Sequence, residues 1–98
     1  MHVSFRLLVE KQRKFFRSGA TLKIEERKKL LRTLKKILES EYDRLTEAVY
    51  KDLRRRPELT YSLEISNVLV EIEYVLEYLD DWASPEKARL TISVCGKL

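Results

Sequence analysis

The sequence predicts an all-α fold of three antiparallel amphipathic helical legs, with the middle leg kinked near Ser40 and a short irregular or extended C-terminal tail. Apolar residues recur every three or four positions along most of the chain, which is the spacing of one face of a helix. Only two glycines and two prolines occur in 98 residues, and this scarcity of breaks favours long helices over many short strands.

The first leg covers about residues 3–18. Its apolar stripe consists of Phe5, Leu8, Val9, Phe15 and Phe16. Gly19 follows this stripe, and a glycine can adopt the left-handed conformation that ends many helices. Thr21 then offers a side-chain oxygen as the N-cap of the next leg.

The second leg covers about residues 22–53 and carries two successive stripes. These are Leu30, Leu31, Leu34, Ile37 and Leu38, then Leu45, Ala48, Val49 and Leu53. An unbroken helix of this length would extend about 45 Å, too far for so small a protein. We expect a break near Ser40, which lies three residues before Asp43 in the pattern of an N-cap with an acid at N3.

The third leg covers about residues 58–79, because Pro57 disfavours helix in the residue before it. Its stripe is the most regular: Ile65, Val68, Leu69, Ile72, Val75, Leu76 and Leu79. Trp82 follows the stripe, and the Ser84-Pro85 pair is expected to end the helix. Residues 91–94 alternate as a strand would, but a lone strand is not stable without a partner.

The net charge of +4 is unevenly distributed. Residues 1–22 have a net charge of +4 and residues 23–56 of +5, whereas residues 57–86 carry eight acidic residues and neither Lys nor Arg. We expect the acidic third leg to pack against the basic second leg and to neutralise much of the field that would attract phosphates. We therefore expect no nucleic-acid partner.

Cysteine usage and hydropathy exclude several classes of protein. The lone Cys95 can form neither an intrachain disulfide nor a zinc cluster. Near the end of the tail, with His2 as the sole histidine, it also lacks a predicted base that would activate it as a nucleophile. No apolar run approaches the roughly 20 residues that span a bilayer, and no signal peptide is recognisable. We expect a cytoplasmic protein, either free or peripheral to an intracellular membrane.

Two sets of charged residues permit a chemical or a structural interpretation. The carboxylates Glu73/Glu77 and Asp80/Asp81 could perform acid–base work or bind a cation, but a solvated face, or one that meets the basic helices, is favoured because no apolar pocket is predicted beside them. The run Arg54–Arg56 could bind phosphate, although a helix C-terminus favours cations for electrostatic reasons alone.

The aromatic residues also permit two interpretations. Residues 13–17 mix cations with Phe15 and Phe16, which would suit RNA or an anionic membrane, but a basic outer face on an amphipathic helix is common. Three tyrosines on the third leg are expected to pack at the rim rather than to form a stacking platform. They are Tyr61, Tyr74 and Tyr78.

Read in order, residues 5–88 resemble the N-terminal helical segment of class 3 (fatty) aldehyde dehydrogenases. The elements that carry the resemblance are Arg13-Lys14-Phe15-Phe16-Arg17-Ser18-Gly19-Ala20-Thr21; Arg27 with Leu30, Leu31 and Leu34; Glu47-Ala48-Val49; Lys51-Asp52-Leu53; Glu64-Ile65, Val68 and Glu71-Ile72; and Leu79, Trp82 and Pro85. Each fragment is weak alone, and their order and spacing make the resemblance specific. It ends just after Lys87.

The resemblance implies an oxidoreductase that converts long-chain or aromatic aldehydes to carboxylic acids with NAD or NADP. In the family a catalytic cysteine and a glutamate perform the chemistry, a Rossmann-type domain binds the cofactor, and a small β element joins two subunits into a dimer. None of these parts has a counterpart here, because the only glycines are Gly19 and Gly96 and neither lies in a strand–loop–helix context. We therefore assign no catalytic, cofactor-binding or metal-binding residue.

The resemblance further implies that residues 1–88 form the N-terminal helical region of an aldehyde dehydrogenase-like protein and that residues 89–98 are a divergent tail, with the cofactor and catalytic domains absent. We expect a fragment or truncated family member that is inactive and binds no cofactor alone. The alternative is a stand-alone helical interaction module. Such a module would self-associate, pair with a related full-length subunit, or bind weakly to an anionic membrane.

Overall fold

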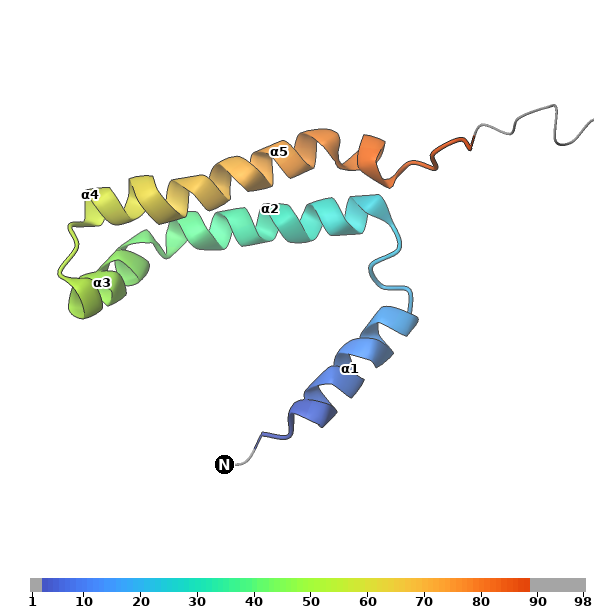
Figure 1. Cartoon of the computed structure of the whole chain (residues 1–98), viewed down its shortest axis with the longest axis horizontal. Helices are drawn as coiled ribbons and strands as arrows, with labels where there is room; N and C mark the ends of the chain where they lie inside the picture. Colours follow the sequence, from blue (N-terminus) through green and yellow to red (C-terminus); the bar gives the residue numbers. More distant parts are fainter. Residues whose placement is uncertain (1–2, 89–98) are drawn as a thin grey trace, which may run out of the picture.

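The computed structural model describes residues 3–88, and all regular structure in that range is helical (Figure 1). The elements are α1 (Phe5–Arg17), α2 (Ile24–Ser40), α3 (Tyr42–Leu53), α4 (Pro57–Thr60), the π-helical turn η1 (Tyr61–Ile65) and α5 (Ser66–Ala83). The predicted all-α class is confirmed. The predicted strand at residues 91–94 lies outside the described residues.

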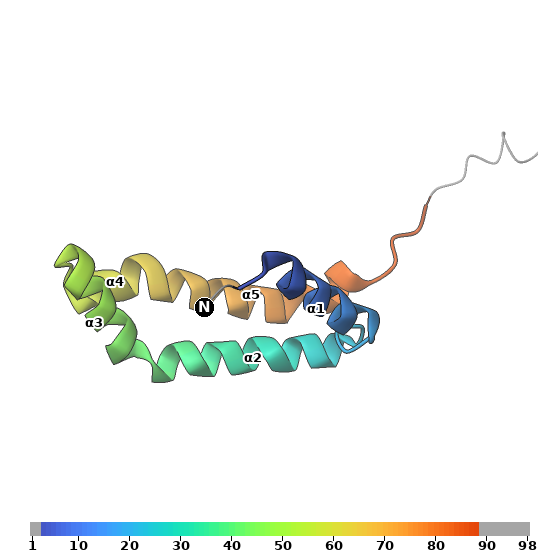
Figure 2. The same ribbon diagram turned by 90° about the horizontal axis from the view of Figure 1, so that it is seen from below.

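The centre of the structure is an antiparallel hairpin of α2 and α5, which lie side by side in both ribbon views (Figures 1 and 2). α3 and α4 form the turn that joins them at one end. Two isoleucines on the inner side of the second arm, Ile65 and Ile72, are buried. Around them lie half-buried residues of both helices: Ile24, Leu31, Leu38, Leu69, Val75, Leu76 and Leu79. Each helix therefore buries one narrow stripe.

The predicted break in the middle leg is confirmed, but the predicted cap is wrong. Glu41 separates α2 from α3 with φ −97° and ψ 15° and occupies the N-cap position without a side-chain hydrogen bond. Ser40 is instead the last residue of α2, and its hydroxyl donates to the carbonyl of Ile37 at 3.0 Å. Because the preceding turn already satisfies this hydroxyl, it does not serve as an N-cap for α3.

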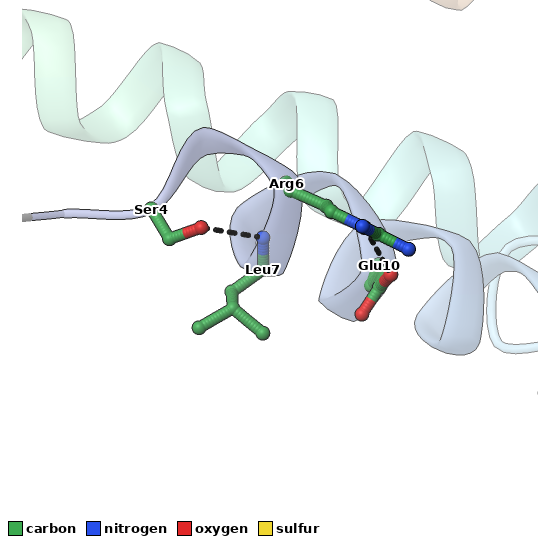
Figure 3. A network of polar contacts seen from close by, with 4 residues as sticks. All are labelled: Ser4, Arg6, Leu7 and Glu10. Atoms are coloured by element: carbon green, nitrogen blue, oxygen red, sulfur yellow. Dashed lines mark hydrogen bonds and ion pairs between the residues drawn. The ribbon is translucent and has the colours of Figure 1, made fainter.

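The ends of α1 are well defined. Leu7 N–H donates to the Ser4 hydroxyl at 3.5 Å as an N-cap, and Arg6 pairs with Glu10 at 3.3 Å on the following turn (Figure 3). Gly19 has φ +79°, and its N–H donates to the carbonyl of Phe16 at 3.1 Å. The predicted glycine stop is confirmed.

The predicted cap at Thr21 is wrong. α2 begins at Ile24, its N-cap residue is Lys23, and no side chain caps it. Thr21 contributes its backbone carbonyl instead, which accepts a hydrogen bond from the guanidinium of Arg27. The turn therefore extends two residues beyond the position that the Thr21 side chain could cap, and an arginine of the next helix secures it.

Only two of the three predicted legs pack antiparallel. α1 contains no buried residue, and Figure 1 shows it diverging from the hairpin after the turn at Gly19. Its phenylalanines remain exposed to solvent, Phe5 by 81%. The amphipathic pattern predicted the helix correctly, but it did not specify which surface its apolar side would meet.

The corner between α3 and α4 is built by Arg54 and Pro57. Arg54 adopts the left-handed conformation at φ 54°, and its N–H donates to the carbonyl of Tyr50 at 2.8 Å. Its guanidinium carbon lies 5.3 Å from the centre of the Tyr50 ring, within cation–π range. Pro57 then opens α4 at a first-turn position, where a proline costs no hydrogen bond. The predicted end of the second leg is confirmed.

The third leg extends from Pro57 to Ala83 and passes through the π-helical turn. It is longer than predicted, since Trp82 lies inside α5. The stop at Ser84 is confirmed, because its N–H and hydroxyl both donate to the carbonyl of Asp81, at 3.3 and 2.6 Å. The π-helical turn was not predicted, because its apolar spacing differs little from that of an α-helix over five residues.

The stability of the hairpin should depend on its buried isoleucines. Ile72 is 5% exposed, so Ile72→Ala is expected to lower the free energy of unfolding by about 2–5 kcal/mol. Val70, on the same helix but 68% exposed, provides a matched control, and Val70→Ala should change it by less than about 0.5 kcal/mol. Urea unfolding followed by circular dichroism measures both. Equal effects of the two variants would contradict the proposed hairpin core.

Replacing Thr60, in contrast, should stabilise the fold. It is 1% exposed, and its hydroxyl has no hydrogen-bond partner among residues 3–88. Because Thr60→Val removes a buried, unsatisfied hydroxyl and nearly preserves the shape, it is expected to raise the free energy of unfolding by about 1 kcal/mol. Thr33→Val is the control, since the exposed Thr33 hydroxyl donates to the carbonyl of Lys29 at 2.9 Å. Destabilisation by Thr60→Val would show that its hydroxyl is satisfied in solution.

Candidate functional site

Within residues 3–88, three ion pairs join the basic segment of residues 23–56 to the acidic segment of residues 57–86. Lys28 pairs with Asp80 and Lys35 with Glu73 between α2 and α5. The third pair, Arg55 with Glu64 at 3.3 Å, lies at the other end of the hairpin. The charge pattern of the sequence thus becomes a contact within one chain, as predicted.

Lys28 is the central cation of this contact. Its side chain is only 11% exposed, and its ammonium also lies 3.8 Å from a carboxylate oxygen of Glu25 on its own helix. A nearly buried ammonium is stable only when it is paired. The surrounding carboxylates therefore hold a lysine in place and do not leave a free acidic cluster.

The Lys35–Glu73 pair is more open to solvent. The hydrogen bond and the charge of Glu73 raise the pKa of Lys35 above its ordinary value of 10.5. Because a raised lysine pKa favours the folded state while the lysine is charged, this contribution is present below pH 10.5 and is lost as pH rises through the folded-state pKa.

In each of the carboxylate pairs Glu73/Glu77 and Asp80/Asp81, only one member forms an ion pair with α2 in the described part of the chain. One member of each pair, Glu73 or Asp80, meets a lysine of α2. The other members, Glu77 and Asp81, are exposed and form no ion pair within residues 3–88. Within that range no group of three His, Cys, Asp or Glu residues has an arrangement that could hold a metal ion. The structural interpretation of these carboxylates is supported.

The arginines of residues 54–56 do not converge on one site. Arg54 lies over Tyr50, Arg55 pairs with Glu64, and Arg56 is the N-cap residue of α4. A phosphate site would need several of these guanidinium groups to converge on one point. Their arrangement supports the structural interpretation, in which the run ends one helix and begins the next.

The aromatic residues separate into two groups. Tyr61 packs edge-on against Tyr42, with ring centres 5.8 Å apart. Tyr74 and Tyr78 form a cluster with Trp82 on α5, with centroid distances of 4.7, 5.6 and 6.2 Å. The part played by Trp82 was not predicted, although the spacing of positions 74, 78 and 82 is that of one helix face.

Among residues 3–88 the surface is unusually apolar, with 22 large hydrophobic side chains exposed. The hollows along the hairpin are shallow and open. One lies between the two arms of the hairpin and is lined by Leu31, Asn67, Val68, Glu71, Ile72 and Val75. Four of these six residues are apolar, and a shallow apolar surface is suited to packing against another protein surface.

Cys95 lies outside the described residues. Over residues 3–88, no helix has both the length and the apolar character required to cross a membrane.

Comparison with known proteins identifies the relatives of this chain. It is 32% identical over 88 residues to the chloroplastic aldehyde dehydrogenase family 3 member I1 of Arabidopsis thaliana, and the match covers 89% of this chain. It is 33% identical over 75 residues to the aldehyde dehydrogenase family 3 protein comG of Dictyostelium discoideum, covering 76% of this chain. The chain is related to the class 3 aldehyde dehydrogenases.

A third relative is the dimeric NADP-preferring aldehyde dehydrogenase of Mus musculus, 29% identical over 84 residues and 86% of this chain. The matched region spans only 16–18% of the length of these three relatives. No family model and no solved structure matches the chain. The resemblance seen in the sequence is therefore confirmed for a helical region about one sixth the length of an aldehyde dehydrogenase.

The ion pair of Lys35 makes the stability of the hairpin pH-dependent. Lys35→Gln should lower the urea midpoint at neutral pH, and the difference from the native chain should shrink as pH rises above 10.5 towards the raised folded-state pKa. Lys36→Gln serves as the control because Lys36 is exposed and forms no ion pair within residues 3–88. A Lys35→Gln effect that stayed constant through the alkaline range would contradict the assignment.

Proposed function

We propose that this chain supplies the N-terminal helical region of an NAD(P)-dependent aldehyde dehydrogenase. The observation that carries the proposal is the 32% identity to a family 3 enzyme over 89% of the chain. In the family the reaction oxidises an aldehyde to a carboxylic acid, and the cofactor and catalytic cysteine belong to other domains. Residues 1–88 would then be the helical region and residues 89–98 a divergent tail.

In this role the helices contribute packing surface and no chemistry. The exposed apolar sides of α1 and α5 would be covered by other parts of an enzyme, and the ion-paired hairpin would keep the two helices in register. Glu73 and Asp80 are used in ion pairs, and the arginines of residues 54–56 in an ion pair, a cation–π contact and a helix cap position, which supports a structural role. We also propose a cytoplasmic location, supported by the single cysteine.

The proposal predicts that these 98 residues alone neither bind NAD or NADP nor oxidise an aldehyde. Calorimetric titration with each dinucleotide should give no binding heat, and incubation with a long-chain or an aromatic aldehyde should form no NADH or NADPH. The mouse dimeric enzyme is the positive control. Cofactor reduction that depends on the purified chain would overturn the proposed inactivity.

A chimaera tests the family role directly. Replacing the aligned 84 residues of the mouse enzyme with the corresponding residues of this chain should yield a folded enzyme that retains aldehyde oxidation. The same chimaera carrying Ile72→Asp should lose folding, because a buried unpaired carboxylate is strongly unfavourable. An insoluble or inactive first chimaera would argue against the role.

A second candidate function is that of a helical interaction module, which the exposed apolar sides of α1 and α5 favour. One mouse relative is named as dimeric, which supports pairing with a related subunit. Attachment of α1 to an anionic membrane is the alternative form of this function. Retention of a full-length class 3 enzyme on the immobilised chain would support pairing, and retention of anionic vesicles alone would support the membrane.

A further inference from the structure

The outer side of α5 carries a continuous apolar surface. We call it the α5 aromatic face, and it consists of Val70, Tyr74, Tyr78 and Trp82. All four residues are exposed, Trp82 by 55%, and the three rings contact one another. Its first two residues lie on the opposite side of the helix from the buried Ile72, so α2 does not cover them.

Acidic residues border this face on both sides. By helical spacing, Glu71 lies along one side and Glu77 and Asp81 along the other. All three are exposed and form no ion pair within residues 3–88. The face is therefore an aromatic strip between unneutralised carboxylates, and a basic amphipathic helix is its chemical complement.

α1 has that character. Its apolar side consists of Phe5, Leu8, Val9, Phe15 and Phe16, all exposed. Lys11 and Arg13 border this side on opposite edges and form no ion pair within the described part of the chain. Arg6 lies on the same edge as Arg13, seven residues earlier, but it is paired with Glu10 (Figure 3).

The two surfaces also match in length. Residues 5–16 of α1 extend about 17 Å and residues 70–82 of α5 about 18 Å along their axes. Each surface is one helix face wide, so one could cover the other along its whole length. Arginine and lysine beside tyrosine and tryptophan rings would add cation–π attraction.

The geometry points to a dimer of two copies of this chain, in which α1 of each copy packs on the α5 aromatic face of the other. The divergence of α1 from its own hairpin (Figure 1) leaves it available to a second molecule. The contact is reciprocal, so a two-fold axis would cover both surfaces of both copies. The inference rests on the interaction-module proposal and makes that module's partner a second copy.

The same observations disfavour an anionic membrane as the occupant. The cations of α1 would suit such a surface, but the carboxylates beside Tyr74 and Trp82 would be repelled by it. Membrane attachment through α1 alone would thus leave the α5 aromatic face uncovered. A second copy neutralises the basic and the acidic surface in one contact.

Charge reversal tests the dimer. One variant carries Lys11→Glu with Arg13→Glu on α1, and the other carries Glu77→Lys with Asp81→Lys on α5. Sedimentation velocity over a concentration series should show that each variant alone dimerises at least about tenfold more weakly than the native chain, because like charges then meet. An equimolar mixture of the two should regain dimers, since each contact in the mixed dimer again joins opposite charges.

The matched control is Lys29→Glu with Lys36→Glu, which makes the same charge change as the α1 variant on exposed positions of α2 away from α5. It should leave dimerisation within about threefold of the native chain, and circular dichroism should show equal helix content in all variants. A monomeric native chain, or variants that fail to pair when mixed, would overturn the inference. A native chain that is monomeric but binds a full-length class 3 enzyme would overturn the dimer and still support the interaction module. A monomer that binds only phosphatidylserine vesicles would overturn the dimer in favour of membrane attachment.

Discussion

The contact between α2 and α5 is the constraint on which the rest of the structure depends. Its apolar part is small, with two buried isoleucines and a row of half-buried residues around them. Lysines of α2 lie at the edge of this stripe and meet carboxylates of α5. The apolar stripe supplies most of the attraction, whereas the ion pairs favour one register of the two helices.

This narrow contact explains why so much of the chain faces outward. An amphipathic helix normally buries a broad stripe against its neighbours, but here the hairpin has only one layer. Leu30, Leu34 and Ile37 of α2 remain exposed behind the contact, as α1 does beside it. Under the proposed function, a second layer of a longer protein would cover this surface.

Sequence periodicity and charge predicted a large part of this fold. The helices, the break near Ser40, the stops at Gly19 and Ser84 and the pairing of basic with acidic segments all follow from local spacing and composition. The positions of α1 and of the caps could not be predicted in the same way. Ser40 does not cap α3 because its hydroxyl already bonds the carbonyl of Ile37, and Thr21 does not cap α2 because α2 begins only after Lys23. The place of α1 depends on a surface that its own pattern does not identify. The aromatic cluster was also missed, because Trp82 was interpreted only as following the apolar stripe and not as lying on one helix face with Tyr74 and Tyr78.

The π-helical turn at Tyr61–Ile65 has a consequence for comparing this chain with its relatives. A π-helical turn contains one residue more than an α-helical turn, so it rotates everything before it relative to α5. A relative with an uninterrupted α-helix here would be one residue shorter between Pro57 and Ile65. An ungapped alignment would then pair the apolar positions of α4 with solvent-facing positions of that relative. Such a shift by one residue would lower the identity counted over this segment.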